Sequence, residues 1–428
     1  MASRADLDGQ DLDDEVLDWR WKGFPALPAG QRVSEFVARR PALFEAGFSW
    51  PIATLSASAI DHNVGVLAAW CTDNGVLLAP HGKTTMAPAL FRRQLAAGAW
   101  AMTAATPWQV RVYRAHGVGR VLLANELVDA DFIRWLVAER AADPGFEFFC
   151  YVDSVAGVDL LGNALAASVG NAAQPLGVLI EMGPLGGRTG CRSAADARAV
   201  AHAVRRHASL MLVGVAGFEG PFGHGRDTAT SAAVRAFAQG LADTLGDLDS
   251  EALLDPRATY YVLTCGGSEH IDVVTAVLRQ PPTCSRPVRG VLRSGSYITH
   301  DHGLYAEASA LAAQLRPAIE VWCQVLSRPE PGLALLGAGR RDVSFDAGMP
   351  IALWRRSIRS GDVLPLDARV SALNDQHAFL DVAPSDLIEV GDLVALGISH
   401  PCTTHDKWQL MPLLDGDRRV IDCVRAYF

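Results

Sequence analysis

Between residues 76 and 292, short apolar runs alternate with segments that repeat apolar residues at helical spacing, and this alternation constrains the fold most strongly. Strands that alternate with helices form parallel sheets. Eight such units predict an α/β fold with a closed eight-stranded (β/α) barrel, rather than a doubly wound open sheet. The predicted strands are Val76–Ala79, Ala101–Ala104, Arg120–Ala124, Glu147–Val152, Leu176–Met182, Leu210–Phe218, Thr259–Thr264 and Val288–Leu292.

Beyond about residue 300 the pattern changes to short apolar runs broken by glycine and proline, which predicts a second, mostly β domain. The chain of 428 residues is long enough for two such units. We therefore expect an N-terminal arm at 1–50 that packs with the β domain, a barrel at 51–300 and the β domain at 301–428. Its predicted strands are Ile319–Leu326, Val343–Phe345, Ala368–Leu373, Ala378–Val382 and Leu393–Leu396.

Composition narrows the class of partner. A formal net charge of -9 and a pI near 5.7 argue against nucleic acid and anionic membranes. The apolar runs are shorter than the ~20 residues of a membrane helix. The acidic start has no apolar segment, so we expect no secretory signal. Because the eight cysteines lack paired spacing, we expect free thiols and a cytoplasmic protein.

Lys83 follows the first predicted barrel strand, within His81-Gly82-Lys83-Thr84. In (β/α) barrels the active residues lie at the C-terminal ends of the strands. An amine at such a position can attack a carbonyl or move a proton. The alternative is a surface lysine in a turn, and the rest of the sequence argues against it.

Two glycine-rich loops follow the seventh and eighth predicted strands, where barrels commonly bind phosphate. They are Cys265-Gly266-Gly267-Ser268 and Arg293-Ser294-Gly295-Ser296-Tyr297. Glycine lets main-chain N–H groups approach a phosphate, and hydroxyl groups donate further hydrogen bonds. A reactive lysine opposite a phosphate site predicts pyridoxal 5'-phosphate, bound to the lysine as a Schiff base.

Other strand exits carry further candidates. His81 could flank or stack near the cofactor ring, and Arg188 lies in the glycine-rich loop 183–190. Glu219 ends the sixth predicted strand, and we predict an acid/base group or a hydrogen-bond partner there. The alternative for Glu219 is an exposed loop carboxylate.

The segment His400-Pro401-Cys402 predicts a metal site in the β domain. An imidazole and a thiolate two residues apart in a loop can bind one ion, and this pair suits zinc better than manganese. Two protein ligands leave coordination positions open for water or substrate, as in catalytic sites. His405 and His377 are possible additional ligands.

Taken together and in order, His81-Gly82-Lys83-Thr84, Arg188-Thr189-Gly190, Gly266-Gly267-Ser268, Ser294-Gly295-Ser296-Tyr297 and His400-Pro401-Cys402 resemble a known enzyme family. The chain is similar to the metal-activated, alanine-racemase-type pyridoxal phosphate enzymes that include D-serine dehydratase and D-threonine aldolase. The resemblance implies that Lys83 carries the cofactor and that Gly267, Ser268, Ser296 and Tyr297 surround its phosphate. It also implies that His400 and Cys402 bind a divalent metal and that the protein is a homodimer.

The resemblance further implies a lyase acting on small D-β-hydroxy amino acids. Dehydration of a D-serine-like substrate to an oxo acid and ammonia is the first expectation. The alternatives are a D-threonine-type aldolase, a racemase and a non-enzymatic pyridoxal phosphate carrier. Two departures bear on this choice. Thr84-Thr85-Met86 follows the lysine where many members of the family have a Thr-His-Lys run. Glu219 stands where a typical aldolase would have a histidine, although His224 could replace that base.

Overall fold

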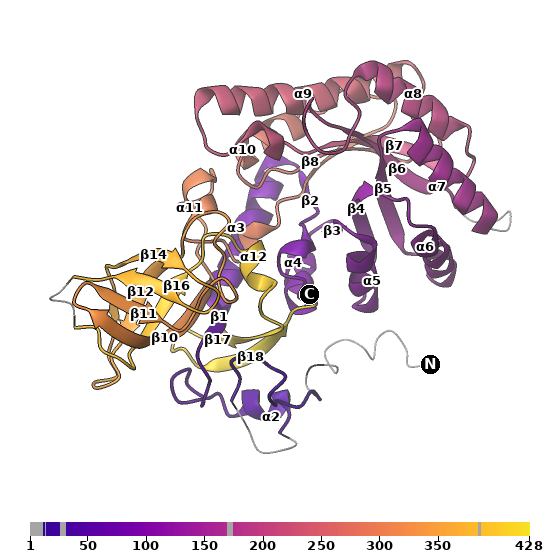
Figure 1. Ribbon diagram of the computed structural model, residues 1–428. Helices are drawn as coiled ribbons and strands as arrows, with labels where there is room; N and C mark the ends of the chain where they lie inside the picture. Colours follow the sequence, from indigo (N-terminus) through magenta and orange to yellow (C-terminus); the bar gives the residue numbers. More distant parts are fainter. Residues whose placement is uncertain (1–11, 13, 26–30, 169–173, 384–386) are drawn as a thin grey trace.

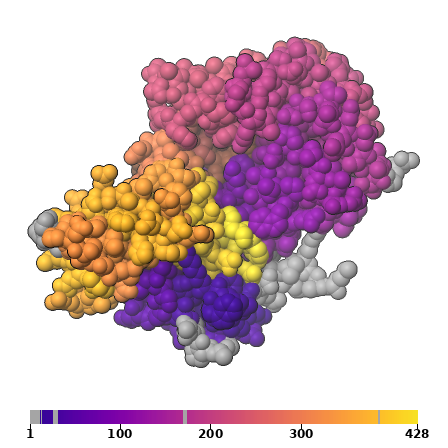
Figure 2. All heavy atoms as spheres, in the orientation of Figure 1, coloured from indigo at the N-terminus to yellow at the C-terminus, as the bar shows by residue number. Residues whose placement is uncertain are grey.

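The computed structural model describes residues 12, 14–25, 31–168, 174–383 and 387–428; most of the acidic start, 1–11, lies outside this part. Two units lie side by side, a barrel surrounded by helices and a unit rich in antiparallel strands (Figure 1). In the space-filling view the two units are distinct lobes in contact, with the N-terminal segment below the strand-rich lobe (Figure 2).

Eight parallel strands form the first sheet, in the order β2-β9-β8-β7-β6-β5-β4-β3. The Trp100 N–H donates to the Leu78 carbonyl at 2.7 Å, and the Thr103 N–H donates to the Pro80 carbonyl at 2.9 Å. These bonds join the two end strands and close the sheet, so the predicted barrel is confirmed. The strands are β2 (Leu77–Leu78), β3 (Met102–Ala104), β4 (Arg120–Glu126), β5 (Glu147–Val152), β6 (Leu176–Met182), β7 (Leu210–Gly217), β8 (Tyr261–Cys265) and β9 (Val288–Leu292).

Helices between the strands cover the outside of the barrel (Figure 1). Their ends follow local sequence signals: the Ser56 hydroxyl accepts the Ala59 N–H at the start of α3, and Gly75 ends it with a φ of 63°. Among the described residues, no helix is both long and apolar enough to cross a membrane. The helices are α3 (Ala57–Asn74), α4 (Pro88–Ala96), α5 (Pro107–Ala115), α6 (Ala130–Ala142), α7 (Val155–Ser168), α8 (Ala194–Arg205), α9 (Thr228–Ser250) and α10 (Ile271–Leu278).

The second unit is built on a ten-stranded sheet. Because β11 pairs with both β15 and β10, the strands from β11 to β10 close into a small barrel. The mostly β second domain is therefore confirmed. Its strands are β10 (Ile319–Glu330), β11 (Leu333–Leu336), β12 (Ile351–Arg356), β13 (Val363–Pro365), β14 (Arg369–Leu373), β15 (Ala378–Asp381), β16 (Leu393–Gly397), β17 (Leu410–Leu414) and β18 (Val420–Arg425), joined by β1 (Ile52–Ser56).

Two segments differ from the sequence expectations. Val343–Phe345 is a loop and not a strand, because the buried Ser344 hydrogen-bonds side chains instead of a neighbouring strand. Its N–H donates to the Thr404 hydroxyl at 3.0 Å, and its hydroxyl lies 3.1 Å from that of Ser399. Strand β1, which we assigned to the barrel region at 51–300, pairs with β10 and β17 of the second sheet.

The N-terminal arm packs on the second sheet through aromatic side chains. Helix α2 (Val33–Ala38) contributes Phe36, whose ring lies 6.1 Å from Phe24 and 5.8 Å from Phe48. This cluster contacts the buried Trp322 of β10. The boundaries of the three parts, 1–50, 51–300 and 301–428, remain a proposal.

Asn63 of α3 joins the barrel to the chain that leads into the β domain. Its side-chain amide donates to the carbonyls of Ile298 and Arg316 at 3.2 and 2.7 Å, and its oxygen accepts the Arg316 N–H at 2.8 Å. The Asn63 side chain is fully buried. It therefore holds the segment that follows the Ser296 loop against helix α3.

We expect Asn63→Ala to lower the free energy of unfolding by about 3 kcal/mol, because it leaves buried main-chain groups without partners. Urea unfolding followed by circular dichroism measures this loss. Asn74→Ala, at the other end of the same helix, removes one bond to the Trp70 carbonyl and should cost less than about 1 kcal/mol. Equal losses in the two variants would contradict the joining role of Asn63.

Candidate active site

One cavity of about 540 Å³ lies at the C-terminal ends of the barrel strands, where the β domain meets them. Side chains from both units line it. Those from the barrel and its loops are His81, Lys83, Thr84, Ala105, Ala124, Asn125, Tyr151, Arg188, Thr189, Phe218, Glu219, Ser268, Glu269, His270, Arg293 and Ser296, with Gly220, Gly223 and Gly295; Tyr305, His400 and Cys402 come from the C-terminal part.

Lys83 lies in a single 3-10 turn (Gly82–Thr84) that follows β2, and its side chain is exposed to the cavity. The turn packs closely on helix α5. A Cβ atom at Gly82 would lie 2.5 Å from the Tyr113 hydroxyl oxygen, so only glycine fits there. The close packing of Gly82 fixes the turn from which the lysine amine extends.

Three positive charges surround His81. Burial, and then the charges of Lys83, Arg293 and Arg188, lower the pKa of His81 well below its usual value. His81 is therefore neutral at physiological pH, and its Nδ1 atom is buried without a partner among the described residues. The cavity combines a neutral imidazole with three cationic side chains, an arrangement that suits an anionic ligand.

The loop after β6 carries Arg188 to the cavity, and Arg192 organises that loop. The Arg192 guanidinium donates to the main-chain carbonyls of Gly187, Thr189 and Gly190 at 3.1, 2.8 and 2.7 Å. The Arg188 guanidinium lies 4.7 Å from the centre of the Phe218 ring, which also lines the cavity. Arg188 thus reaches the site by stacking on an aromatic side chain.

The loop after β8 is held by Glu219, which is 3% exposed. The Glu219 carboxylate accepts hydrogen bonds from the main-chain N–H groups of Gly266 and Gly267 and from the Cys265 thiol. Gly266 and Gly267 do not line the cavity, whereas the neighbouring Ser268 does. Glu219 reaches the cavity, but its oxygens are already occupied by this loop.

The loop after β9 places Arg293 and Ser296 on the cavity wall. Arg293 is buried and donates to the Thr264 hydroxyl and the Gly217 carbonyl, both at 2.7 Å. Tyr297 is not among the residues that line this cavity, and its hydroxyl accepts a bond from the Gln94 amide at 2.9 Å. A Cβ atom at Gly295 would lie 2.4 Å from the His81 carbonyl oxygen, which explains glycine at that position.

His400 and Cys402 line the same cavity from the β domain. The His400 Nδ1 atom lies 2.7 Å from the Asp346 carboxylate, which orients the ring and leaves Nε2 for another partner. Burial lowers the pKa of His400, but hydrogen bonds and charges of Cys402 and Asp346 raise it to about 9. Burial opposes ionisation of the Cys402 thiol, but His400, Thr84 and Lys83 together outweigh it and lower the pKa of Cys402.

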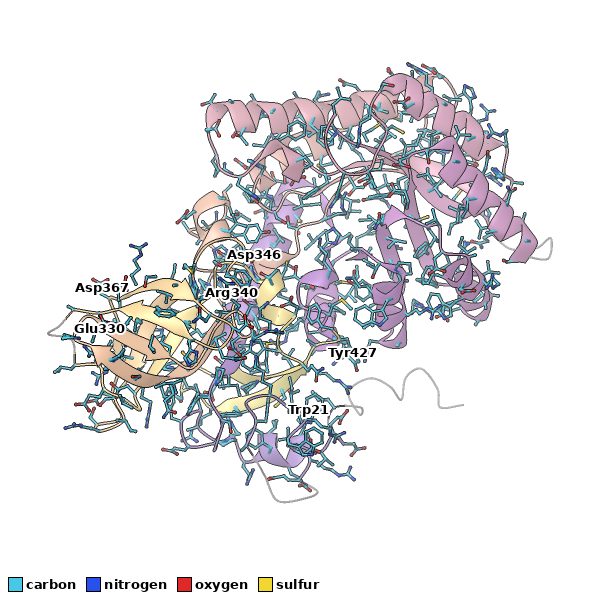
Figure 3. The ribbon with its side chains drawn as sticks, in the orientation of Figure 1. Trp21, Glu330, Arg340, Asp346, Asp367 and Tyr427 are labelled. Carbon is cyan, nitrogen blue, oxygen red and sulfur yellow. The ribbon has the colours of Figure 1, made fainter. Side chains whose placement is uncertain are left out.

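This donor set fits a divalent metal ion. An imidazole nitrogen, a thiolate and a carboxylate behind the imidazole are typical of zinc sites. Figure 3 places Asp346 on the part of the β domain that faces the barrel. Among the described residues, no group of three or more His, Cys, Asp or Glu side chains is arranged to bind a metal.

The two additional histidines considered from the sequence do not line the cavity. His405 is fully buried, and burial lowers its pKa to about 3. His377 is exposed in the connection between β14 and β15. His224, the possible substitute base, is an exposed residue whose Nδ1 lies 2.8 Å from the Glu269 carboxylate.

Sequence reasoning missed several cavity residues, of which His270 and Tyr151 are the most notable. His270 is 1% exposed with both ring nitrogens unpartnered within the described residues, and the buried Tyr151 hydroxyl is likewise without a partner there. His270 and Arg293 directly follow barrel strands or their glycine loops, so the strand-exit rule could have found them. Asp346 had no such signal, since it lies 54 residues from His400 in the sequence.

The half-buried Glu126 and the buried Glu181 are neighbouring carboxyl groups near the cavity-lining Tyr151. Glu126 ends β4 beside Tyr151 of β5, and its carboxyl oxygens are buried next to the Glu181 carboxyl group. Burial, and then the charge of Glu181 on β6, raise the pKa of Glu126 to about 8. Glu126 is therefore largely protonated at neutral pH.

This raised pKa makes stability depend on pH. Protonated Glu126 stabilises the fold fully below pH 4.5, the pKa of this group in the unfolded chain. That stabilisation is lost as the pH rises through about 8, its pKa in the folded chain. Glu126→Gln imitates the protonated form and should remove the loss. We expect the free energy of unfolding of the variant, relative to that of the wild type, to increase by about 2 kcal/mol when the pH is raised from 5 to 8. This is about half the value that corresponds to the full pKa shift, because the group is partly screened. Urea unfolding at the two pH values measures the gain, and the exposed Glu330→Gln is the control (Figure 3). A gain for Glu126→Gln that is independent of pH would contradict this account.

The chain is similar in sequence to known proteins. A sequence model of the family described as "Putative serine dehydratase domain" matches residues 318–414, the segment from β10 to β17. A D-threonine aldolase from Arthrobacter sp. is 23% identical over 354 residues, which cover 82% of this chain and 85% of that protein.

Solved structures agree with this result. A D-threonine aldolase from Filomicrobium marinum has a TM-score of 0.71 at 23% identity, with 89% of this chain and 95% of that chain covered. D-threo-3-hydroxyaspartate dehydratase from Delftia sp. HT23 has a TM-score of 0.69 at 20% identity, with 89% and 97% covered. An alanine racemase from Clostridium difficile 630 has a TM-score of 0.60 at 11% identity, with 88% and 98% covered. The resemblance inferred from the sequence motifs is confirmed.

Proposed function

We propose that this protein is a pyridoxal phosphate- and divalent metal-dependent lyase that acts on D-β-hydroxy amino acids, with dehydration to an oxo acid and ammonia as its main reaction. The observation that carries the proposal is the shared cavity. It joins Lys83 of the barrel to His400 and Cys402 of the β domain.

The cavity fits the cofactor in size and charge. Its volume of about 540 Å³ lies within the usual range of small-molecule sites. Lys83, Arg188 and Arg293 would balance a phosphate and a substrate carboxylate. Lys83 would hold the cofactor, with Ser268 and Ser296 as hydroxyl donors. When bound, pyridoxal phosphate supplies an electron sink for negative charge at the substrate Cα.

Elimination requires a proton acceptor at Cα and help for the leaving hydroxyl at the adjacent Cβ. The structure supports this pairing, because the Cys402 sulfur lies 3.4 Å from the hydroxyl oxygen of Thr84, the residue after Lys83. The Lys83 amine can accept the α-proton. A divalent ion on His400 and Cys402 would supply Lewis-acid stabilisation of the departing hydroxyl.

Aldol cleavage to glycine and an aldehyde is the second candidate, and His270 favours it. Cleavage requires a base for the β-hydroxyl proton. The Glu219 carboxylate accepts hydrogen bonds from the loop after β8, and His224 is exposed and paired with Glu269. His270 lines the cavity, and its ring nitrogens have no partner among the described residues. Among the relatives, one is named an aldolase and another a dehydratase. A non-enzymatic pyridoxal phosphate carrier fits the structure less well, because the β domain also lines the cavity.

Product analysis tests the proposal. The purified protein, loaded with pyridoxal phosphate, is incubated with D-serine, D-threonine or D-threo-3-hydroxyaspartate, with and without a chelator. We expect ammonia and an oxo acid, and their loss with the chelator. Glycine and an aldehyde would establish the aldolase instead, L-amino acid product would establish a racemase, and no turnover of any substrate would overturn the lyase proposal.

Three finer points belong to the same proposal. The ion is zinc, because a nitrogen and a sulfur ligand suit it better than manganese. The active form is a homodimer, as the resemblance implies. The protein acts in the cytoplasm, with which the eight free cysteines are consistent.

A further inference from the structure

The loop Cys265–Ser268, here called the glycine loop, has its main-chain groups bound on two sides. Glu219 accepts the N–H groups of Gly266 and Gly267 from one side. On the other side, the Gly266 carbonyl accepts the Arg293 N–H at 3.1 Å, and the Gly267 carbonyl accepts the Ser294 hydroxyl at 2.8 Å. The polar main-chain groups of both glycines are therefore already used within the protein.

Steric fit restricts the loop as well. A Cβ atom at Gly266 would lie 2.7 Å from a Glu219 carboxylate oxygen, and one at Gly267 would lie 2.5 Å from the Leu292 side chain. Gly267 also has a φ of 83°, which favours glycine. The carboxylate and the two glycines thus form one closely packed unit. Glu219 requires glycine at 266, whereas Leu292 and the positive φ require glycine at 267, so neither glycine depends on an approaching phosphate.

We propose that Glu219 is a positioning residue that fixes the glycine loop so that Ser268 is presented to an anionic ligand group, and that Glu219 is not the acid or base of the reaction. Successive main-chain N–H groups are an anion-binding arrangement, and here the protein's own carboxylate fills it. The inference deepens the proposed function, because the anionic group in question would be the cofactor phosphate.

The charge of this carboxylate requires compensation near an incoming phosphate. Arg293 lines the same cavity as Glu219 and is buried there. The Arg293 guanidinium otherwise donates only to neutral oxygens, those of Thr264 and Gly217, among its hydrogen bonds in the described residues. Arg293 therefore carries positive charge that can serve the ligand.

The test separates a positioning role from acid/base chemistry with Glu219→Gln. The amide keeps the size of the side chain but directs an NH₂ group at an N–H donor, so one bond to the loop is lost. We expect hydrogen exchange of the Gly266 and Gly267 amides in the cofactor-free protein to become about tenfold faster or more. We also expect the dissociation constant of pyridoxal phosphate to rise about tenfold. At saturating cofactor, kcat should stay within about threefold of the wild type and its pH profile should keep its shape.

A second variant and a control test whether misfolding of Glu219→Gln could explain the result. Ser294→Ala loosens the loop from the opposite side and should weaken cofactor binding in the same direction, while Glu330→Gln should leave binding unchanged. Unchanged amide exchange in Glu219→Gln would overturn the inference. A loss of about 100-fold in kcat with unchanged cofactor affinity would overturn it too and identify an acid or base. If the wild type binds no pyridoxal phosphate, the proposed function fails, and amide exchange alone still decides the role of Glu219.

Discussion

Replacing Lys83 with alanine should abolish covalent retention of pyridoxal phosphate and lower activity by about 10³-fold or more, because within the described part of the chain no other amine lines the cavity. The chain contains three lysines, Lys22, Lys83 and Lys407. Lys22 is paired with the Asp342 carboxylate at 2.7 Å, and Lys407 is paired with Asp406 at 3.0 Å. Only Lys83 extends into the cavity.

Visible absorption after dialysis measures cofactor retention. Borohydride reduction followed by peptide mapping then shows which lysine carries the label. Lys22→Arg keeps the ion pair with Asp342 and should retain the cofactor and activity. A label on Lys22 or Lys407 in the wild type, or full retention in Lys83→Ala, would refute the assignment.

Removing either predicted metal ligand should eliminate activity and leave cofactor binding intact. We expect His400→Ala and Cys402→Ala each to lower turnover of D-serine by about 10²-fold or more, because the hydroxyl would depart without a Lewis acid. A chelator should have the same effect on the wild type, and added zinc should reverse it. Metal content by elemental analysis and cofactor absorption are measured on the same samples.

The chain offers matched controls for both ligands. His377→Ala removes an exposed histidine of the β domain, and Cys284→Ala removes a half-buried cysteine at the barrel. Both variants should keep metal and activity. Loss of the cofactor absorption together with activity in His400→Ala and Cys402→Ala would show instead that the segment is structural.

Much of the fold was determined by local sequence patterns. The eight barrel strands lie within a few residues of the apolar runs, since each strand is buried on both faces and reads as a continuous apolar segment. The helix starts at Ser56 and Thr106 also depend on local sequence, because a capping hydroxyl accepts an N–H three residues later. The position of Lys83 at a strand exit also follows from local pattern alone.

Contacts between distant segments were decided only by the tertiary structure. Strand β1 joins the second sheet because its edges pair with β10 and β17, and nothing in its own sequence specifies those partners. Val343–Phe345 has strand-like residues, but its polar groups bond Ser399 and Thr404 more than 50 residues later. A local apolar pattern predicts burial, whereas pairing depends on which segments folding brings together.

The candidate site shows the same division. Sequence identified Lys83, Arg188, Ser268, Ser296, His400 and Cys402 as candidates, and the structure gathers them at one cavity. The sequence alone could not show that Glu219 binds the glycine loop, which lies 46 to 48 residues away, or that Asp346 orients His400. A side chain's type and strand exit are properties of the sequence, but its hydrogen-bond partners, and hence whether it is free to react, are set by the packing of segments far apart in the chain.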